Sequence, residues 1–321
     1  MKLLVTGITG QLGAALAAAA LARGHSVRGL VRDPARLRDL PGVEPIAGEL
    51  GDRGSLERAV AGVDAVLHAA GLVSYLPAQA GRLRAVNVEG TRALLVAAQS
   101  AGVQRFVFTS SIAAGGPVLG EGEGDEDSPF AMAGQGFVYG ETKREAEDLV
   151  CAAGGLALRP GIILGAGDRN INGGRMILDL LAGKIPGVPS GATTLAVLDD
   201  VVEGHLLALE RGEPGRRYIL GGTTGSFQEL YKSIAAVLGV APPRWVLPDL
   251  LVQLVAAGRA WRAGPADPEP SLTPLLARIL VRNRRFSSRR AIAELGYRPS
   301  PIARGVEAAL DWFRAEGLLP R

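Results

Sequence analysis

Two side chains of this sequence are spaced for proton chemistry, Tyr139 and Lys143. The chain holds only five tyrosines and four lysines, so a separation of four residues is unexpected by chance. On a helix this spacing puts both side chains on one face. An ammonium ~4 Å from a phenol near a protein surface is worth up to about 4 kcal/mol, enough to lower a tyrosine pKa from about 10 by as much as ~3 units. We therefore expect Tyr139 to exchange a proton with an alcohol near neutral pH, the alternative being a surface pair without a role.

A second pattern lies at the N-terminus, where a strand-like run at residues 2–6 is followed by Gly7, Gly10 and Gly13 and an alanine-rich helix. Glycines in this context allow a tight turn, close approach of a pyrophosphate to the backbone, and tight packing of the helix on the strand. The helix N-terminus then faces the phosphates. The pattern predicts a dinucleotide site that contains Gly7, Thr9, Gly10, Gln11, Leu12 and Gly13.

A third group, the pair Ser110 and Ser111, follows a strand expected at residues 105–109. Ligands of doubly wound sheets bind at the carboxyl edge, where such strands end. A serine hydroxyl there can hydrogen-bond a substrate oxygen while Tyr139 transfers the proton.

The elements that must position these groups alternate along the first half of the chain. Strand-like runs alternate with helical stretches, which predicts the α/β class and a Rossmann-type doubly wound parallel sheet. Regular crossovers predict strand order 3-2-1-4-5-6. The expected strands are residues 3–6, 26–31, 44–47, 65–68, 105–109 and 156–158, and the expected helices are residues 10–23, 55–61, 82–101 and 137–153.

The alternation breaks after Pro160, where Gly-rich and Pro-rich sequence begins. We expect a dinucleotide-binding domain in residues 1–160, with 196–222 returning to it as a helix and a strand. Residues 161–195 and 223–321 are expected to form a smaller, mainly helical C-terminal substrate-binding domain. The acidic stretch 115–128 is expected to be a mobile loop beside the site.

The amino-acid composition limits the classes of protein to which this chain can belong. Hydrophobic residues make up 47% and charged residues 21% of the chain, which is typical of a soluble globular protein. The single cysteine, Cys151, excludes an internal disulfide. A formal net charge of +3 is too small to indicate nucleic-acid binding. No run of 18 apolar residues predicts a membrane span, and Gly7 interrupts any signal-peptide core, so we expect a cytoplasmic protein without an integral membrane segment.

Taken together, the glycine turn, Ser111 and the Tyr139–Lys143 pair resemble the extended short-chain dehydrogenase/reductase family, within the NAD-dependent epimerase/dehydratase superfamily. The resemblance covers essentially the whole chain. It implies that Ser111 orients the substrate oxygen, that Tyr139 is the acid/base, and that Lys143 lowers the Tyr139 pKa and binds the nicotinamide ribose. Ser110 is the weaker choice, because in relatives the functional serine lies nearest the following loop.

The resemblance extends to further cofactor contacts on four segments. Residues 67–71 look like the motif that lines the cofactor after the fourth strand, and residues 48–50 look like an adenine-contacting Gly-Asp-Leu with glutamate in place of aspartate. For His68, a structural or cofactor-lining role is favoured over a catalytic one. The residues added by this resemblance are Glu49, Leu50, His68, Ala69, Ala70, Gly71, Asn87, Pro160, Gly161 and Ile162.

The choice of cofactor depends on the end of the second strand. An NAD enzyme usually offers a carboxylate there to the ribose 2′-OH, but this position holds Val31, followed by Arg32. A guanidinium suits the 2′-phosphate of NADP, with Arg36 as a candidate helper. Asp33 either caps the short helix at Pro34 or contacts an NAD ribose. We expect NADP, with NAD as the alternative, and no metal ion.

Departures from family patterns narrow the reaction. Dehydratases place an Asp-Glu pair after the catalytic serine or threonine, but Ile112 and Ala113 stand here. Nucleotide-sugar epimerases often carry an Arg-Asp-x-x-His run where this chain has residues 193–197, so the diphosphate clamps are missing. Residues 27–34 and 286–299 look like the dihydroflavonol reductase and 3β-hydroxysteroid dehydrogenase branch. This branch acts on carbonyl or alcohol groups of apolar, often cyclic, substrates.

Two features of the C-terminal half have competing interpretations. Seven arginines between residues 278 and 298 could bind an anionic substrate, a membrane surface or nucleic acid, or could form a solvated face paired with acids. A set of apolar residues is either a lid over an apolar ligand or ordinary core. This set is Trp245, Leu250, Leu251, Leu254, Trp261 and Leu272.

Three functions stay open at this point. The favoured one is an NAD(P)-dependent oxidoreductase with a small-molecule carbonyl or alcohol substrate and a Ser-Tyr-Lys mechanism. The alternatives are an NAD-dependent nucleotide-sugar epimerase and a non-catalytic NAD(P)-sensing protein. Family analogy implies a homodimer through the helices near 87–100 and 139–153, and we expect no nucleic-acid partner.

Overall fold

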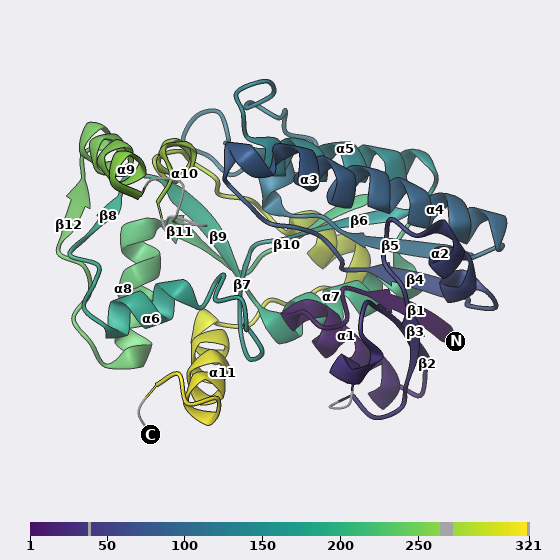
Figure 1. Cartoon of the computed structure of the whole chain (residues 1–321). Coiled ribbons are helices and arrows are strands. Elements are labelled where there is room, and N and C mark those ends of the chain that lie inside the picture. Colours follow the sequence, from purple (N-terminus) through teal and green to yellow (C-terminus); the bar gives the residue numbers. More distant parts are fainter. Residues whose placement is uncertain (38–39, 264–271, 320–321) are drawn as a thin grey trace.

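The computed structural model describes residues 1–37, 40–263 and 272–319. At its centre is a parallel sheet of seven strands in the order β10-β6-β5-β4-β1-β2-β3 (Figure 1). The predicted order 3-2-1-4-5-6 is confirmed, and β10 adds a strand beside β6. The strands are β1 Lys2–Thr6, β2 Ser26–Val31, β3 Val43–Ala47, β4 Ala65–His68, β5 Arg105–Thr109, β6 Leu156–Pro160 and β10 Arg217–Leu220.

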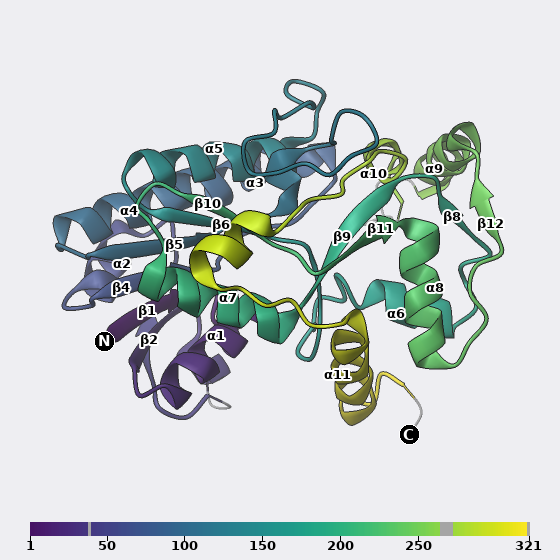
Figure 2. The same cartoon turned by 180° about the vertical axis from the view of Figure 1, so that it is seen from behind.

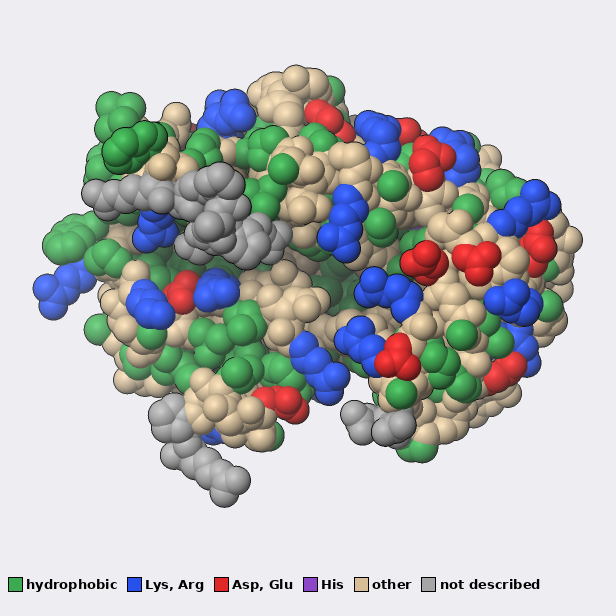
Figure 3. Space-filling model, in the orientation of Figure 1, with side chains coloured by type: hydrophobic (Ala, Val, Ile, Leu, Met, Phe, Trp, Pro, Cys, Tyr) green, Lys and Arg blue, Asp and Glu red, His purple; other side chains and the backbone are tan. Residues whose placement is uncertain are grey.

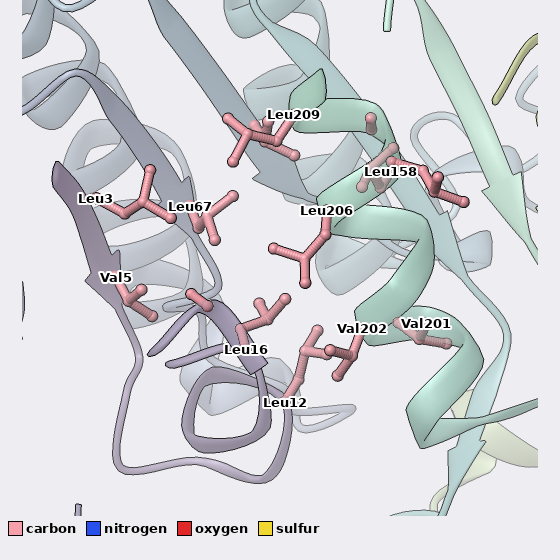
Figure 4. Packing of buried hydrophobic residues seen from close by; sticks show 14 of the residues in the cluster. Leu3, Val5, Leu12, Leu16, Leu67, Leu158, Val201, Val202, Leu206 and Leu209 are labelled. Atoms are coloured by element: carbon pink, nitrogen blue, oxygen red, sulfur yellow. The ribbon is translucent and has the colours of Figure 1, made fainter. Parts of the chain in front are cut away.

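Helices cover both faces of the sheet (Figures 1 and 2), which confirms the α/β doubly wound fold. The central strands are buried on both sides, because each must contact a helix layer above and below. On one face lie α1 Gln11–Ala22 and α7 Leu198–Arg211, whose leucines and valines pack on the sheet (Figure 4). On the other lie α2 Arg53–Val60, α3 Ala80–Arg84, α4 Gly90–Ser100 and α5 Val138–Ala152.

Short helical turns complete this half of the chain. They are the 3₁₀ turns η1 Pro34–Leu37, η2 Pro77–Gln79 and η4 Ile112–Gly115, and the π-helical turn η3 Ala85–Glu89.

The chain leaves the main sheet at Gly161, whose N–H donates to the Leu220 carbonyl at 3.1 Å. A Cβ there would lie 2.6 Å from the Thr194 carbonyl oxygen, so glycine permits the crossing into the second part. That part contains a sheet of order β11-β9-β7 and a pair β12-β8. Its strands are β7 Ile162–Leu164, β8 Gly187–Pro189, β9 Ala192–Val197, β11 Thr223–Ser226 and β12 Trp245–Leu247, and its helices are α6 Arg175–Leu181, α8 Phe227–Leu238, α9 Asp249–Ala263, α10 Pro274–Leu280 and α11 Ile302–Ala315.

Two segments differ from expectation. The π-helical turn η6, Ala291–Leu295, packs against α7 and β10 of the main sheet, because Ala291, Leu295 and Tyr297 join that core. The acidic stretch 115–128 is anchored at its far end, where Glu126 is buried and its carboxylate accepts the Ile219 N–H at 2.8 Å. Among the described helices, none is both long and apolar enough to cross a bilayer.

The glycine turn after β1 depends on close backbone contacts. Gly7 has φ of +67°, and a Cβ there would lie 2.6 Å from the Ala70 nitrogen in the segment that follows β4. A Cβ on Gly13 would lie 2.2 Å from the Gly7 carbonyl oxygen. These two positions therefore fix the distance between α1, the turn and the end of β4.

We expect Gly13→Ala to lower the free energy of unfolding by about 2–3 kcal/mol, because backbone atoms must move to admit the methyl group. The matched control is Gly258→Ala in α9, where a Cβ meets no atom within 4 Å and alanine should stabilise the helix by up to ~1 kcal/mol. Urea denaturation of both variants measures the contrast. A Gly13→Ala protein as stable as the wild type would contradict the close packing.

Candidate active site

Helix α5 carries three ionisable groups at intervals of four residues, Tyr139, Lys143 and Glu147, and all three are buried. The Glu147 carboxylate receives the Arg159 guanidinium at 2.5 and 2.9 Å and the Ser110 hydroxyl at 2.8 Å. Burial acts to raise the pKa of Glu147, but the hydrogen bonds and charge of Arg159 hold it below its ordinary value. These bonds fix the rotation of α5 and so direct Tyr139 and Lys143 toward the ends of the strands.

The Lys143 ammonium is held at the end of β5. It donates to the Thr109 carbonyl at 2.7 Å and lies 4.6 Å from the centre of the Phe108 ring. A Cβ on Gly71 would be 3.2 Å from Nζ, so the bare backbone after β4 also borders the ammonium. Burial lowers the pKa of Lys143 to about 8, although the charge of Glu147 acts in the opposite direction.

The two serines after β5 have different partners. Ser110 donates to Glu147 and is committed to the interior. The Ser111 oxygen accepts the Ala113 N–H at 3.1 Å, and its side chain is close enough to Tyr139 to lower the pKa of the phenol. The structure thus brings Ser111, and not Ser110, together with the phenol.

The protonation of Tyr139 differs from the expectation that Lys143 lowers its pKa. Burial raises the pKa above its ordinary value, and Tyr75 acts in the same direction, while Ser111 and Arg284 only partly oppose this rise. The physical reason is the aromatic wall around the phenol, where the ring of Tyr75 lies 6.0 Å from that of Tyr139 and stacks on Phe137 at 6.1 Å. In the protein alone the phenol is therefore neutral at pH 7 and suited to donate a proton.

A chain of buried hydrogen bonds connects the ends of β1 and β4 with the turn η3. His68 contacts the Thr6 hydroxyl at 2.7 Å through Nδ1 and the Thr91 hydroxyl at 2.9 Å through Nε2. Because Thr91 donates to the Asn87 carbonyl at 2.7 Å, we assign the ring proton of His68 to Nε2. Burial lowers the pKa of His68 to about 3, so the ring is neutral. Both ring nitrogens of His68 are thus engaged within the protein, so the side chain is structural and only the backbone of His68 is left to line a cofactor.

Asn87 joins this chain to α5. Its amide oxygen accepts the Leu72 N–H at 2.8 Å, and its amide nitrogen donates to the Leu72 carbonyl at 3.0 Å and the Thr142 hydroxyl at 3.2 Å. The segment after β4 is thereby tied to the helix that carries Tyr139 and Lys143.

The predicted cofactor residues follow the carboxyl ends of five strands of one sheet, the edge at which dinucleotides bind. The Gln11 side chain is engaged within the protein, since it donates to the carbonyls of Gly165 and Ala166 at 3.0 and 3.1 Å. The Leu12 side chain belongs to the core, which leaves its backbone N–H. By strand, the residues are Gly7, Thr9, Gly10, Gln11, Leu12 and Gly13 after β1, Arg32 after β2, Glu49 and Leu50 after β3, His68, Ala69, Ala70 and Gly71 at the end of β4, and Pro160, Gly161 and Ile162 at the end of β6.

The turn fits a dinucleotide pyrophosphate. A Cβ on Gly10 would meet only the Gly7 carbonyl, at 3.3 Å, so its other side is open to a ligand. Helix α1 begins at Gln11 and has no acidic residue in its first turn to repel an anion. Figure 3 shows that this face of the molecule is hollowed between the main-sheet part and the part that contains α6, α8 and α11.

At the end of β2, Asp33 takes the capping role, because its Oδ1 accepts the Ala35 N–H at 3.0 Å at the start of η1. Arg32 and Arg36 are exposed, and within the described ranges neither pairs with an acid. The same ranges contain no cluster of three His, Cys, Asp or Glu side chains able to hold a metal ion.

The structure also adds residues that sequence reasoning missed. Tyr75, Leu275 and Ile279 share a hydrophobic cluster with Tyr139, and the charge of Arg284 acts to lower the pKa of the phenol. No local pattern distinguishes them, because they come from separate loops and from α10. Of the residues that could be a lid or ordinary core, Trp245, Leu250 and Trp261 are not core, because they are 60%, 69% and 86% exposed, whereas Leu272 packs in a small cluster with α9 and α10.

The family model described as NAD dependent epimerase/dehydratase family matches residues 3–221. Sterol demethylase protein B of Methylococcus capsulatus is 34% identical over 333 residues, covering 99% of this chain and 100% of the relative. A 3-beta-hydroxysteroid dehydrogenase of Mycolicibacterium neoaurum is 30% identical over 323 residues, covering 93% and 87%. Together with a putative dihydroflavonol 4-reductase of Synechocystis, 31% identical over 327 residues and covering 98% of this chain and 94% of the relative, this likeness confirms the expected branch.

Solved structures agree with these likenesses. The crystal structure of gox2253 superposes with a TM-score of 0.82 at 33% identity, covering 99% of this chain and 98% of that one. A short-chain dehydrogenase/reductase superfamily protein from Agrobacterium tumefaciens with bound NAD gives a TM-score of 0.72 at 27% identity, with 98% of each chain covered.

The Lys143 ammonium predicts a pH dependence of stability. Its pKa is about 8 in the folded protein and about 10.4 in an unfolded chain, so between these values the unfolded chain binds more protons. Stability should therefore rise with pH across this window, by up to ~3 kcal/mol relative to a Lys143→Met variant. Urea denaturation of the cofactor-free proteins from pH 7 to 10.5 measures the difference. Parallel curves for the two proteins would contradict the prediction.

Proposed function

Since the chain belongs to the NAD dependent epimerase/dehydratase family, we propose that it transfers hydride between nicotinamide and a carbonyl or alcohol on an apolar small molecule. It is an NAD(P)-dependent oxidoreductase of the extended short-chain dehydrogenase/reductase type. The observation that carries the proposal is the convergence of Ser111 and Tyr139 beside a buried Lys143, at the edge where the dinucleotide turn lies.

The three groups divide the work of proton transfer. When bound, the dinucleotide supplies or accepts the hydride. Ser111 hydrogen-bonds the reacting oxygen, and the neutral Tyr139 donates its proton to that oxygen during reduction. Lys143, fixed by the Thr109 carbonyl and bordered by Gly71, binds the ribose and stabilises the tyrosinate that remains.

An apolar substrate is supported by the surroundings of the phenol. Leu72, Tyr75, Leu275 and Ile279 share a hydrophobic cluster with Tyr139, so that α10 supplies one wall. The names of two relatives, a sterol demethylase protein and a hydroxysteroid dehydrogenase, support the same class.

For the cofactor we favour NADP over NAD. Arg32 follows β2 directly and has no acidic partner in the described part of the chain, so its guanidinium is available to a 2′-phosphate. Asp33 is engaged as a cap, which supports the same choice. The NAD bound to one solved relative keeps NAD as the alternative.

We also propose that a second copy of the chain covers the outer face of α4 and α5. A depression of about 520 Å³ lies there, lined in part by Phe130 and Leu149, on the opposite side of α5 from Lys143. Val96 on α4 is also exposed on that side. Light scattering by the purified protein separates a dimer from a monomer.

A nucleotide-sugar epimerase is the second candidate function, supported by the family alone. An epimerase would retain NAD through purification and interconvert nucleotide sugars without added cofactor. Oxidation of NADPH by a panel of apolar ketones, with no interconversion of nucleotide sugars, distinguishes the two. Absence of both activities would favour an NAD(P)-sensing protein.

The proton-transfer roles are tested by Tyr139→Phe and by a matched pair of serine variants. We expect Tyr139→Phe to lower kcat by about 10²–10⁴ and Ser111→Ala by about 10²–10³, with NADPH binding retained. Ser110→Ala should leave kcat within a few-fold but lower the free energy of unfolding by about 1–3 kcal/mol, because its hydrogen bond to buried Glu147 is lost. Steady-state kinetics with an apolar ketone and urea denaturation provide the readouts. A Tyr139→Phe enzyme with wild-type kcat would exclude the proposed mechanism.

The cofactor choice is tested by Arg32→Gln. Loss of a charge-assisted bond to the 2′-phosphate is expected to raise the NADPH dissociation constant about 10–100-fold while leaving that for NADH unchanged. Arg36→Gln is the neighbouring control and should have a smaller effect. Fluorescence titration of each protein with both dinucleotides measures this, and tighter binding of NADH than NADPH by the wild type would reject the choice.

A further inference from the structure

Arg284 differs from the other arginines of its segment. Arg285 pairs with Glu229 at 3.9 Å, and Arg290 pairs with Asp127, both at the surface. Arg284 is only 5% exposed, and within the described residues it has no acidic partner. One cation of the arginine-rich stretch is thus buried without an acidic partner in residues 1–37, 40–263 and 272–319.

The guanidinium uses few of its donors. Nη2 reaches the Thr193 hydroxyl at a long 3.4 Å, and Nε is buried with no hydrogen-bond partner among the described residues. The Arg284 backbone N–H, in contrast, donates to the Ala192 carbonyl at 3.0 Å and holds the residue in place. A guanidinium has five N–H donors and stays charged, so most of its hydrogen-bonding capacity is unused.

An unpaired buried charge is costly, and the cost is normally offset by a counter-ion with good hydrogen bonds. Burial lowers the pKa of Arg284, and Tyr75 and Tyr139 act in the opposite direction. Within the described chain no acid supplies the missing charge. A ligand anion would supply it, and a carboxylate matches the planar fork of the guanidinium with two parallel bonds.

The position of Arg284 connects this anion to the chemistry. The residues on either side of Arg284 contact the loop that follows Ser111: the Val118 N–H donates to the Asn283 carbonyl at 2.7 Å, and Phe286 packs with Ile112 in a small buried cluster. The charge of Arg284 also acts on the Tyr139 phenol. An oxygen that receives the Tyr139 proton and a carboxylate on Arg284 can therefore belong to one ligand.

We propose that Arg284 binds a substrate carboxylate that lies one or two carbons from the reacting carbon. The substrate class is then a 2- or 3-oxo acid, or the matching hydroxy acid, with an apolar body against α10. The inference rests on the proposed function, because the reacting carbon is the one that Tyr139 serves. It adds the charge of the substrate and its placement relative to the reacting oxygen.

The test compares acids with their methyl esters. The probes are 3-hydroxydecanoate and 2-hydroxydecanoate, each beside its methyl ester, titrated calorimetrically into the protein saturated with NADPH. We expect at least one acid to bind about 10–100-fold more tightly than its ester, the range for charge-assisted hydrogen bonds. Arg284→Met should reduce this preference to within about threefold, and Arg284→Lys should keep part of it. Arg285→Met, at the half-buried and paired neighbour, should keep it in full.

A stability readout separates ligand binding from a structural role. Removing a buried unpaired cation should leave the Tm of the ligand-free Arg284→Met protein unchanged or higher, whereas a structural arginine would lower it on replacement. Equal binding of acid and ester by the wild type, or binding of neither in both pairs, would overturn the proposal. An unchanged acid preference in Arg284→Met would do the same.

The proposed function can fail separately. It is measured by Tyr139-dependent oxidation of NADPH with neutral apolar ketones, which carry no carboxylate. If that oxidation is absent while the acid preference depends on Arg284, the carboxylate site stands and the reaction is wrong. If oxidation occurs without an acid preference, the reaction stands and the carboxylate site is wrong.

Discussion

The buried ion pair between Glu147 and Arg159 is the interaction on which the site depends. Glu147 lies on the same face of α5 as Tyr139 and Lys143, so fixing its carboxylate on β6 fixes the rotation of all three groups. A buried pair of this kind contributes little net stability compared with apolar packing, but breaking it leaves an unpaired charge at a cost of about 3–5 kcal/mol. The pair instead fixes the position of α5. An apolar contact would allow the helix to rotate about its axis, whereas the two hydrogen bonds of the guanidinium to the carboxylate do not.

A second constraint aligns the cofactor side of the site with α5. The hydrogen bonds from Thr6 through His68 and Thr91 to Asn87 connect the end of β1, the end of β4 and the turn η3. Each hydroxyl in the chain both donates and accepts, so the chain is fully satisfied only while His68 is neutral. Burial ensures this by lowering its pKa to about 3. Because Asn87 also donates to Thr142 on α5, one network of hydrogen bonds connects the glycine turn after β1 with the helix that carries Tyr139 and Lys143.

Much of the fold could be predicted from the sequence because its signals are local. Buried strands read as short apolar runs, and the glycines at 7, 10 and 13 report backbone contacts within one turn. The charge state of Tyr139 could not be predicted, since it depends on burial by Tyr75 and other residues remote in the chain. Arg284 and Arg285 are adjacent residues of the same type, so the sequence cannot tell them apart. Only tertiary packing buries Arg284 and leaves Arg285 paired with Glu229.

The electrostatics of the site are unbalanced in the protein alone. Two cations, Lys143 and Arg284, are buried and act on or adjoin a phenol that burial keeps neutral, while Glu147, one turn after Lys143 on α5, is already held by Arg159. Such an arrangement lowers the stability of the free protein, which residues selected for folding alone would not do. The arrangement becomes favourable when negative charge enters the site. This charge can come from the phosphates of a dinucleotide, from the tyrosinate formed in reduction, or from an anionic substrate group. In the proposed mechanism, the same imbalance that weakens the free protein would favour the negative charge that develops during proton transfer.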